Sequence, residues 1–116
     1  MSALPNPVPE PLKIDIGCGK NKRGPEWVGV DQYAFDGVDH VCNAGADRLP
    51  FDDNSVEEVH SSHFVEHLTQ VQRCHFFNEL WRVMKPGAKA TIITPHWSNA
   101  CAYGDPTHQW PPMSEW

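Results

Sequence analysis

The sequence of 116 residues has no apolar run close to the roughly 18 residues that span a membrane. Its first twelve residues, MSALPNPVPEPL, have neither the basic start nor the apolar centre of a signal peptide. Its four cysteines are far apart and form no C-x-x-C pair, which argues against a zinc knuckle or a redox dithiol. The formal net charge of −6 disfavours a protein whose main role is to bind the phosphate backbone of nucleic acids. These absences predict a cytoplasmic protein that acts away from membranes and nucleic acid.

The composition predicts one compact domain with short flanking segments. Hydrophobic residues make up 40% of the chain and charged residues 21%, which suffices for one modest core. Prolines at positions 5, 7, 9 and 11 predict an extended arm over residues 1–11. The domain itself is expected over residues 12–99. An aromatic and proline-rich segment then follows over residues 100–116.

Five short segments rich in β-branched residues predict strands. They occupy residues 12–17, 27–31, 38–42, 56–62 and 89–97. Only ten residues separate Ile16 from Trp27, and six separate Asp31 from Val38. Because a crossover that contains a helix needs about a dozen residues, the first two connections are expected to be loops or single helical turns.

One helix is clearly indicated over about residues 70–84. Thr69 and Gln72 form a T-x-x-Q capping box at its start. Its expected buried face has an apolar residue at every third or fourth position: Val71, Cys74, Phe77, Leu80 or Trp81, and Met84. Strands that alternate with crossovers predict an α/β protein with a Rossmann-like, mostly parallel sheet of about five strands.

A candidate ligand site lies where the first two strands end. Asp15, Gly17 and Gly19 follow the first strand, and Asp31 closes the second. Glycines let a ligand approach backbone amides closely, and a carboxylate accepts hydrogen bonds from the vicinal hydroxyls of a ribose. The pattern therefore favours a nucleotide-like ligand at the carboxyl edge of the sheet.

Four blocks of sequence together resemble the class I S-adenosylmethionine-dependent methyltransferases. They are DIGCG (15–19), VGVD (28–31), LPFDDNSVEEVHSSHFVEHL (49–68) and LWRVMKPGAKATI (80–92). The resemblance covers about residues 12–108 and implies S-adenosylmethionine as cofactor. It also implies binding roles for a set of residues at the strand ends: Asp15, Gly17, Cys18, Gly19, Asp31, Asn43, Ala44, Ser62 and His63.

Each part of this set has its own implied contact. The glycine loop passes the methionine part of the cofactor, Asp31 holds the ribose, and Asn43 with the Ala44 backbone contacts adenine. Ser62 and His63 face both cofactor and substrate. The chain departs from the family pattern at Asn21, where a further glycine is usual, and at the adenine position, which is Asn43 or, in another register, Gly45.

The family's sheet continues beyond the fifth strand with an antiparallel hairpin that this sequence does not supply. The resemblance thus predicts either a C-terminally truncated domain or another cover for the fifth strand. An open edge of this kind favours pairing with another chain. We expect a homodimer, because twofold pairing closes on itself, or else a different partner over that edge.

Three functions remain open at this stage. The first is methyl transfer to a small-molecule or saccharide-like acceptor, with His63, His96 and His108 as candidate proton acceptors. The second is a methyltransferase-like binding or assembly module without turnover. The third is a zinc hydrolase, since HFVEH matches the H-x-x-E-H pattern through His63, Glu66 and His67. The capping box at Thr69 instead favours a strand-to-helix turn there, without metal.

Overall fold

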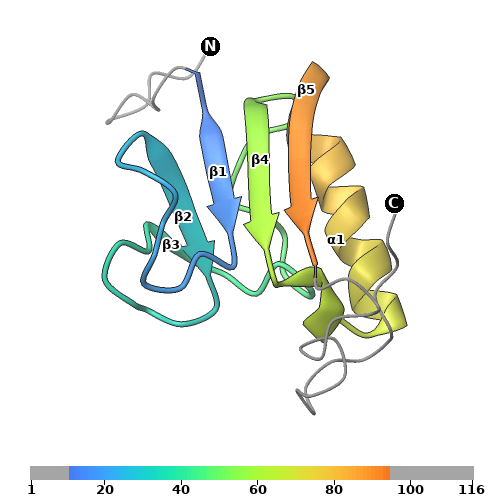
Figure 1. Cartoon of the computed structure of the whole chain (residues 1–116). Coiled ribbons are helices and arrows are strands. Elements are labelled where there is room, and N and C mark those ends of the chain that lie inside the picture. The colour runs from blue at the N-terminus through green and yellow to red at the C-terminus, as the bar shows by residue number, and fades with distance from the viewer. Residues whose placement is uncertain (1–10, 95–116) are drawn as a thin grey trace.

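A five-stranded parallel sheet forms the centre of the molecule (Figure 1). The computed structural model describes residues 11–94, so His96, His108 and nearly all of the predicted arm and C-terminal segment lie outside the described residues. The strands are β1 (Lys13–Ile16), β2 (Trp27–Asp31), β3 (His40–Val41), β4 (Val56–Ser62) and β5 (Met84–Ile93). No helix within the described range is long and apolar enough to cross a membrane.

The strand order across the sheet is β3-β2-β1-β4-β5, and every neighbouring pair is parallel. β1 therefore lies in the middle, and the chain crosses to one side for β2 and β3 and to the other side for β4 and β5. No helix occurs between β1 and β2 or between β2 and β3. These observations confirm the predicted Rossmann-like α/β fold and its short first crossovers.

Helix α1 (Gln70–Val83) connects β4 to β5 after a short 3₁₀ helix, η1 (Val65–His67). It begins at the predicted capping box. The N–H of Gln72 donates to Thr69 Oγ1 at 3.3 Å, and the N–H of Thr69 donates to Gln72 Oε1 at 2.9 Å. These two hydrogen bonds satisfy amides that the first turn of a helix would otherwise leave unpaired.

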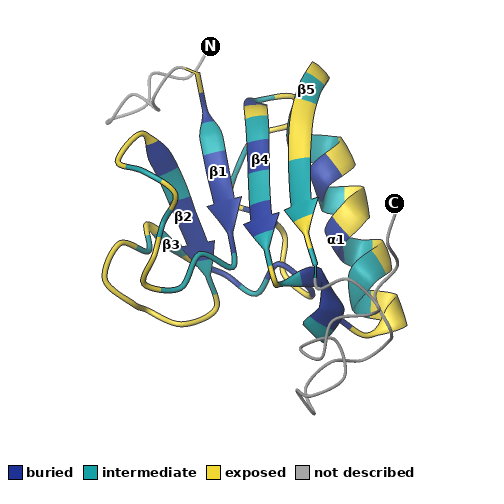
Figure 2. Ribbon diagram, viewed as in Figure 1, coloured by how far each residue is buried: buried dark blue, intermediate teal, exposed yellow. Residues whose placement is uncertain are grey.

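The predicted buried face of α1 is right at Leu80 and wrong at most of its other positions. Val71 is 79% exposed and Trp81 is 87% exposed, whereas Phe76, Leu80 and Val83 are buried against the sheet (Figure 2). Both sets recur at helical spacing, because apolar residues occupy more than one face of α1. Periodicity alone cannot choose between two such stripes. Contact with the apolar core of the sheet decides the orientation.

The start of β5 also differs from the prediction. The strand begins at Met84 rather than at residue 89, so α1 passes into it without a separate loop. Pro86 and Gly87 lie inside the strand, where its register with β4 shifts. Gly87 has φ +81°, a left-handed conformation that favours glycine. Regular pairing begins with Lys89 opposite Glu58, which is where the sequence placed the strand.

Arg82 ties the loop before β4 to the end of α1. Its Nη1 donates to the Phe51 carbonyl and to Asp53 Oδ1, and its Nη2 donates to the Leu49 carbonyl, each at 2.9 Å. Glu79 accepts from Nε and Nη2 at 2.9 Å and from the Leu49 N–H at 2.7 Å. The hydrogen bonds from Arg82 hold the pKa of Glu79 below its ordinary value. One guanidinium thus joins helix and loop.

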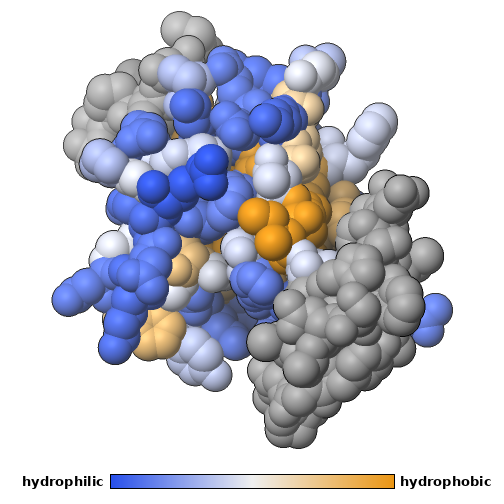
Figure 3. All heavy atoms as spheres, viewed as in Figure 1, coloured by the Kyte–Doolittle hydropathy of each residue, from blue (hydrophilic) through white to orange (hydrophobic). Residues whose placement is uncertain are grey.

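The two faces of the sheet have opposite character. Ile14, Ile16 and Val59 are buried in the core that α1 covers. On the opposite face, Lys13 of β1 lies opposite Glu58 of β4, and Glu58 in turn lies opposite Lys89 of β5. Figure 3 shows this face, on which hydrophilic side chains predominate and one apolar patch lies beside the lower end of β5.

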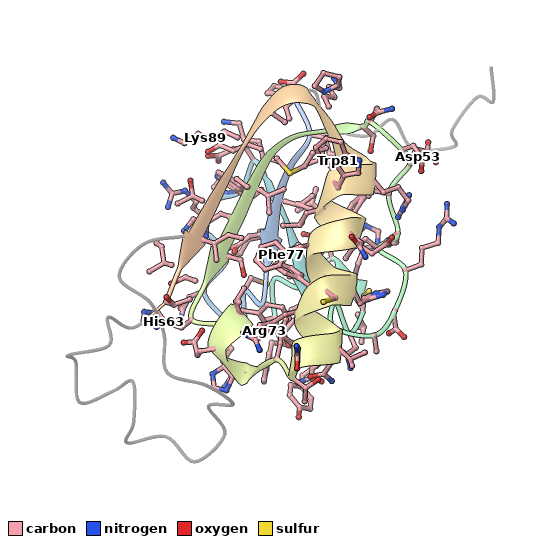
Figure 4. The ribbon with its side chains drawn as sticks, turned by 90° about the vertical axis from the view of Figure 1, so that its right-hand side faces the viewer. Asp53, His63, Arg73, Phe77, Trp81 and Lys89 are labelled. Atoms are coloured by element: carbon pink, nitrogen blue, oxygen red, sulfur yellow. The ribbon has the colours of Figure 1, made fainter. Side chains whose placement is uncertain are left out.

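β5 forms one end of the sheet, and within residues 11–94 no strand pairs with its outer edge. Figure 4 looks onto this edge and shows Phe77 and Trp81 on the flank of α1 beside it. Phe77 is 37% exposed and Trp81 is 87% exposed. An open strand edge and an exposed aromatic flank therefore lie on the same side of the described fold.

Candidate functional site

A pocket of about 250 Å³ opens at the carboxyl ends of β1, β2 and β3. This is the edge at which parallel α/β sheets bind their ligands. The volume lies just below the roughly 300–1,000 Å³ of small-molecule sites, so the pocket fits part of a nucleotide-sized ligand. Its walls are formed by Ile16, Gly17, Val30, Asp31, Gln32, Tyr33, Phe35, Cys42, Asn43, Ala44 and Phe64.

Four of the nine residues expected to bind cofactor lie in this wall: Gly17, Asp31, Asn43 and Ala44. Gly17 follows β1 with φ +73°, and its N–H donates to the Val30 carbonyl at 2.7 Å. A Cβ on Gly17 would lie 2.9 Å from Cδ1 of Phe64. Both the backbone conformation and the close approach of Phe64 therefore require glycine here.

Asp31 joins the glycine loop to the end of β2. Its Oδ2 accepts from the Gly19 N–H at 2.9 Å, and its Oδ1 accepts from the Tyr33 N–H at 3.0 Å. A carboxylate has about four acceptor positions, so capacity for two more donors is left. Asp31 thus shapes the pocket and still offers acceptors to the hydroxyl groups of a ligand.

Asn43 supports the loop after β3 from inside the pocket wall. Its Oδ1 accepts from the Gly45 N–H at 3.0 Å, and its own N–H donates to Asp47 Oδ2 at 3.0 Å. A Cβ on Gly45 would lie 3.0 Å from Leu68, so Gly45 is packed against protein rather than against the pocket. Of the two registers considered for the adenine position, the pocket contains Asn43.

Asp15 lies away from the pocket, beneath the glycine loop. It is 4% exposed; its Oδ2 accepts from the Arg23 N–H at 2.9 Å, and its Oδ1 is 3.3 Å from His60 Nδ1. The His60 ring packs edge-on against Trp27, with 6.1 Å between ring centroids. In this geometry Asp15 fixes the crossover between β1 and β2 and does not line the pocket.

Cys18 follows Gly17 but does not line the pocket. Burial, together with the negative charges of Asp15 and Asp31, raises the pKa of the Cys18 thiol to about 11. The thiol therefore remains protonated near neutral pH and is a poor nucleophile. Gly19, with φ +56°, completes the turn and gives its N–H to Asp31.

Ser62 and His63 lie at the end of β4, outside the pocket wall. His63 adopts φ +55°, and its N–H donates to the Ile93 carbonyl at 2.7 Å. Its side chain is 60% exposed, with Nδ1 at 3.5 Å from Oε2 of the buried Glu66. In Figure 4 the His63 side chain lies at the tips of β4 and β5, on the side away from α1. The next residue, Phe64, reaches into the pocket wall.

Sequence reasoning missed the aromatic part of the site. Tyr33 and Phe35 follow β2 with their ring centroids 5.8 Å apart, and Phe64 faces them from the chain segment after β4. The stretch QYAF directly after Asp31 was the available signal, because loops at the ends of strands often carry binding residues. Phe64 gave no local signal, since only the folded chain brings it there.

The zinc-hydrolase pattern does not form its required geometry. It needs His63 and His67 one turn apart on a long helix. Instead, His63 has a left-handed backbone and His67 ends the 3₁₀ helix η1. Among the described residues, no three His, Cys, Asp or Glu side chains are grouped so as to hold a metal ion. The strand-to-helix turn that the sequence favoured is what the structure has at these positions.

Comparison with known proteins places the chain in a family. A family model described as a methyltransferase domain matches residues 14–92. That match covers most of the chain, so the protein belongs to this methyltransferase-domain family, and the resemblance predicted from the sequence is confirmed. No curated protein matched significantly.

Two solved structures show the same fold. A SAM-dependent methyltransferase from Archaeoglobus fulgidus superposes with a TM-score of 0.73 at 26% identity, over 93% of this chain and 57% of that one. A complex of the Haloferax volcanii Trm112 methyltransferase activator with a protein assigned as a methyltransferase gives 0.52 at 22% identity, over 70% and 43%. The chain thus spans about half the length of these two structures. S-Adenosylmethionine is the cofactor that the first of them names.

Proposed function

We propose that this protein binds S-adenosylmethionine at the pocket and transfers its methyl group to a small-molecule or saccharide-like acceptor in the cytoplasm. The observation that carries the proposal is the placement of Asp31 and Gly17 in one pocket wall at the carboxyl edge of a parallel sheet. The net charge of −6 favours an acceptor other than bulk nucleic acid.

The residues present fit the nucleoside part of this cofactor. Asp31 has acceptor capacity for the ribose hydroxyls, and Asn43 with the backbone of Ala44 borders the space for adenine. Phe35 and Phe64 supply aromatic surface on which a flat base packs. The turn of Gly17, Cys18 and Gly19 borders the methionine side in this proposal, with Ser62 and His63 at the acceptor side; Asp15 supports the turn from below.

The chemistry itself needs little from the protein beyond positioning. Bound S-adenosylmethionine supplies a methyl group on a positively charged sulfur, which a nucleophile displaces in line. The chain orients the two reactants at the edge of the sheet and excludes water, which favours direct displacement. The products are the methylated acceptor and S-adenosylhomocysteine.

Titration calorimetry with S-adenosylhomocysteine tests the binding site. We expect Asp31→Ala to weaken binding about 10- to 100-fold, because the variant loses hydrogen bonds from a charged group that are worth roughly 1.5–3 kcal/mol. Asp52→Ala is the matched control, since Asp52 is exposed in the loop before β4 and does not line the pocket. Equal affinity of Asp31→Ala and wild type would contradict the proposal that Asp31 binds the ribose hydroxyls.

A binding or assembly module without turnover is the second candidate. The chain spans only 57% of the similar Archaeoglobus fulgidus structure, and Asn21 replaces a usual glycine of the cofactor loop. The two candidates differ in product formation. Methylated product from any member of a broad acceptor panel excludes the module, whereas cofactor binding without product across the panel supports it.

We further propose that a second copy of the chain covers the outer edge of β5. Within residues 11–94 no strand pairs with this edge, and an edge strand of this kind favours pairing with another strand. Trp81 offers apolar surface on the same side. Light scattering on the 116-residue chain at tens of micromolar is expected to give the mass of a dimer. A monomer at that concentration would contradict the proposal, and Trp81→Glu should convert a dimer to monomers.

A further inference from the structure

The end of β4 joins an exposed imidazole to a buried carboxylate. The His63 side chain is 60% exposed, the Glu66 side chain is 1% exposed, and Nδ1 of the first lies 3.5 Å from Oε2 of the second. Glu66 lies on η1, three residues after His63. Burying a carboxylate is costly, so its position against an imidazole points to a defined role.

The backbone at His63 is held in an unusual conformation. A φ of +55° in a residue other than glycine costs on the order of 1 kcal/mol or more, and such residues cluster at functional sites. Two constraints maintain it here: the His63 N–H donates to the Ile93 carbonyl of β5, and η1 starts directly after Phe64. The turn places the imidazole at the carboxyl edge, one residue before a residue of the pocket wall.

The contact with Glu66 is an ion-pair distance rather than a hydrogen bond, and it distinguishes the two ring nitrogens by charge. A carboxylate beside Nδ1 favours the tautomer in which Nδ1 carries the proton, and Nε2 on the other side of the ring then keeps a lone pair. The same carboxylate stabilises the positive charge that forms when Nε2 accepts a proton. A base oriented by a third group in this way is the usual arrangement for activating a nucleophile.

We propose that Glu66 is a positioning residue that holds His63 in the Nδ1–H tautomer, so that Nε2 accepts the proton of the methyl acceptor. The catalytic step rests on the proposed function, whereas the tautomer does not. In that step the lone pair of the acceptor bonds to the methyl carbon and the carbon–sulfur pair stays on sulfur. The acceptor's O–H or N–H proton moves to Nε2.

Side-chain ¹H–¹⁵N NMR of the full chain, at about pH 8.5, two units above the pKa of about 6.5 of a free imidazole, measures the tautomers directly. His63→Gln identifies the signals of His63. His75 provides the internal reference, because its Nε2 lies 2.6 Å from the Asp47 carbonyl and must carry the proton there. We expect His63 to show the opposite pattern to His75. In Glu66→Met, which removes both acceptor oxygens, the Nε2–H form of His63 should become the major one, while His75 stays unchanged.

Each outcome decides one part of the proposal. An Nε2–H pattern for His63 in wild type overturns it, even if Glu66→Met fails to fold. An unchanged tautomer in a folded Glu66→Met also overturns it. Saturating S-adenosylhomocysteine should shift the His63 signals and leave those of His75 in place. Bound ligand without a shift at His63 removes His63 from the site, whereas failure to bind contradicts the proposed function and leaves the tautomer result standing.

Discussion

Replacing Phe76 with alanine is expected to lower the free energy of unfolding by about 3–5 kcal/mol, as for other fully buried phenylalanines. Phe76 has no exposed surface and packs edge-on against Phe64 and Phe77, with ring centroids 5.4 and 5.2 Å away. Because Phe64 forms part of the pocket wall, the cavity left by Phe76 also loosens the ligand site. Urea denaturation followed by circular dichroism measures the first effect, and calorimetry with S-adenosylhomocysteine measures the second.

Val71→Ala is the matched control for Phe76→Ala on the same helix. Val71 is 79% exposed, so its truncation should change the free energy of unfolding by no more than about 0.5 kcal/mol. The pair also separates the two apolar stripes of α1. A larger loss for Val71→Ala than for Phe76→Ala would mean that the stripe expected from the sequence faces the sheet after all.

Arg82→Ala is expected to destabilise the protein by about 3 kcal/mol. The change removes charge-assisted hydrogen bonds to the Leu49 and Phe51 carbonyls and leaves the Glu79 carboxylate, itself 13% exposed, without its cation. Arg82→Lys should recover less than half of this loss, because an ammonium group lacks the planar fork that reaches helix and loop together. Chemical denaturation of the three proteins side by side gives the comparison.

Lys85→Ala sets the scale for an ordinary ion pair. Lys85 Nζ lies 3.0 Å from Glu57 Oε1, and both side chains are more than a third exposed, so the loss should be at most about 1 kcal/mol.

Acid titration adds an independent check on Arg82. Because its hydrogen bonds lower the pKa of Glu79, this stabilisation is present above the unfolded-state pKa of Glu79 and disappears as the pH falls through the folded-state value. In Arg82→Ala the free energy of unfolding should therefore fall less steeply as the pH drops through this range. A cost for Arg82→Ala no greater than that for Lys85→Ala would contradict the role of Arg82.

Features encoded locally were predictable from the sequence. β2 and β4 have the predicted bounds, because short runs of β-branched residues between turn residues mark them. The capping box likewise marks the start of α1, because its two residues are only three positions apart in the sequence. At the candidate site, Gly17 and Asp31 line the pocket, and their meeting there was predictable because parallel strands end at one edge of the sheet.

Features that depend on distant contacts were not predictable. The face that α1 buries depends on the sheet beneath it, and Phe64 joins the pocket only when β4 pairs beside β1. Asp15 does not line the pocket, because its carboxylate accepts from the Arg23 N–H and faces His60 from β4. None of these relations leaves a trace in spacing or composition, because each joins residues far apart in the chain.

The all-parallel strand order also determines how this chain reaches its native state. Parallel neighbours cannot be joined by a tight hairpin. Each pair of strands therefore forms only after the longer connection between them has folded. β4, α1 and β5 make up the most local complete unit, and it follows β1, β2 and β3 in the chain. β1 acquires its second neighbour only when β4 pairs with it. The high contact order that results predicts slow folding, with the apolar faces of β1 and β2 exposed to solvent until the second half of the chain docks on them.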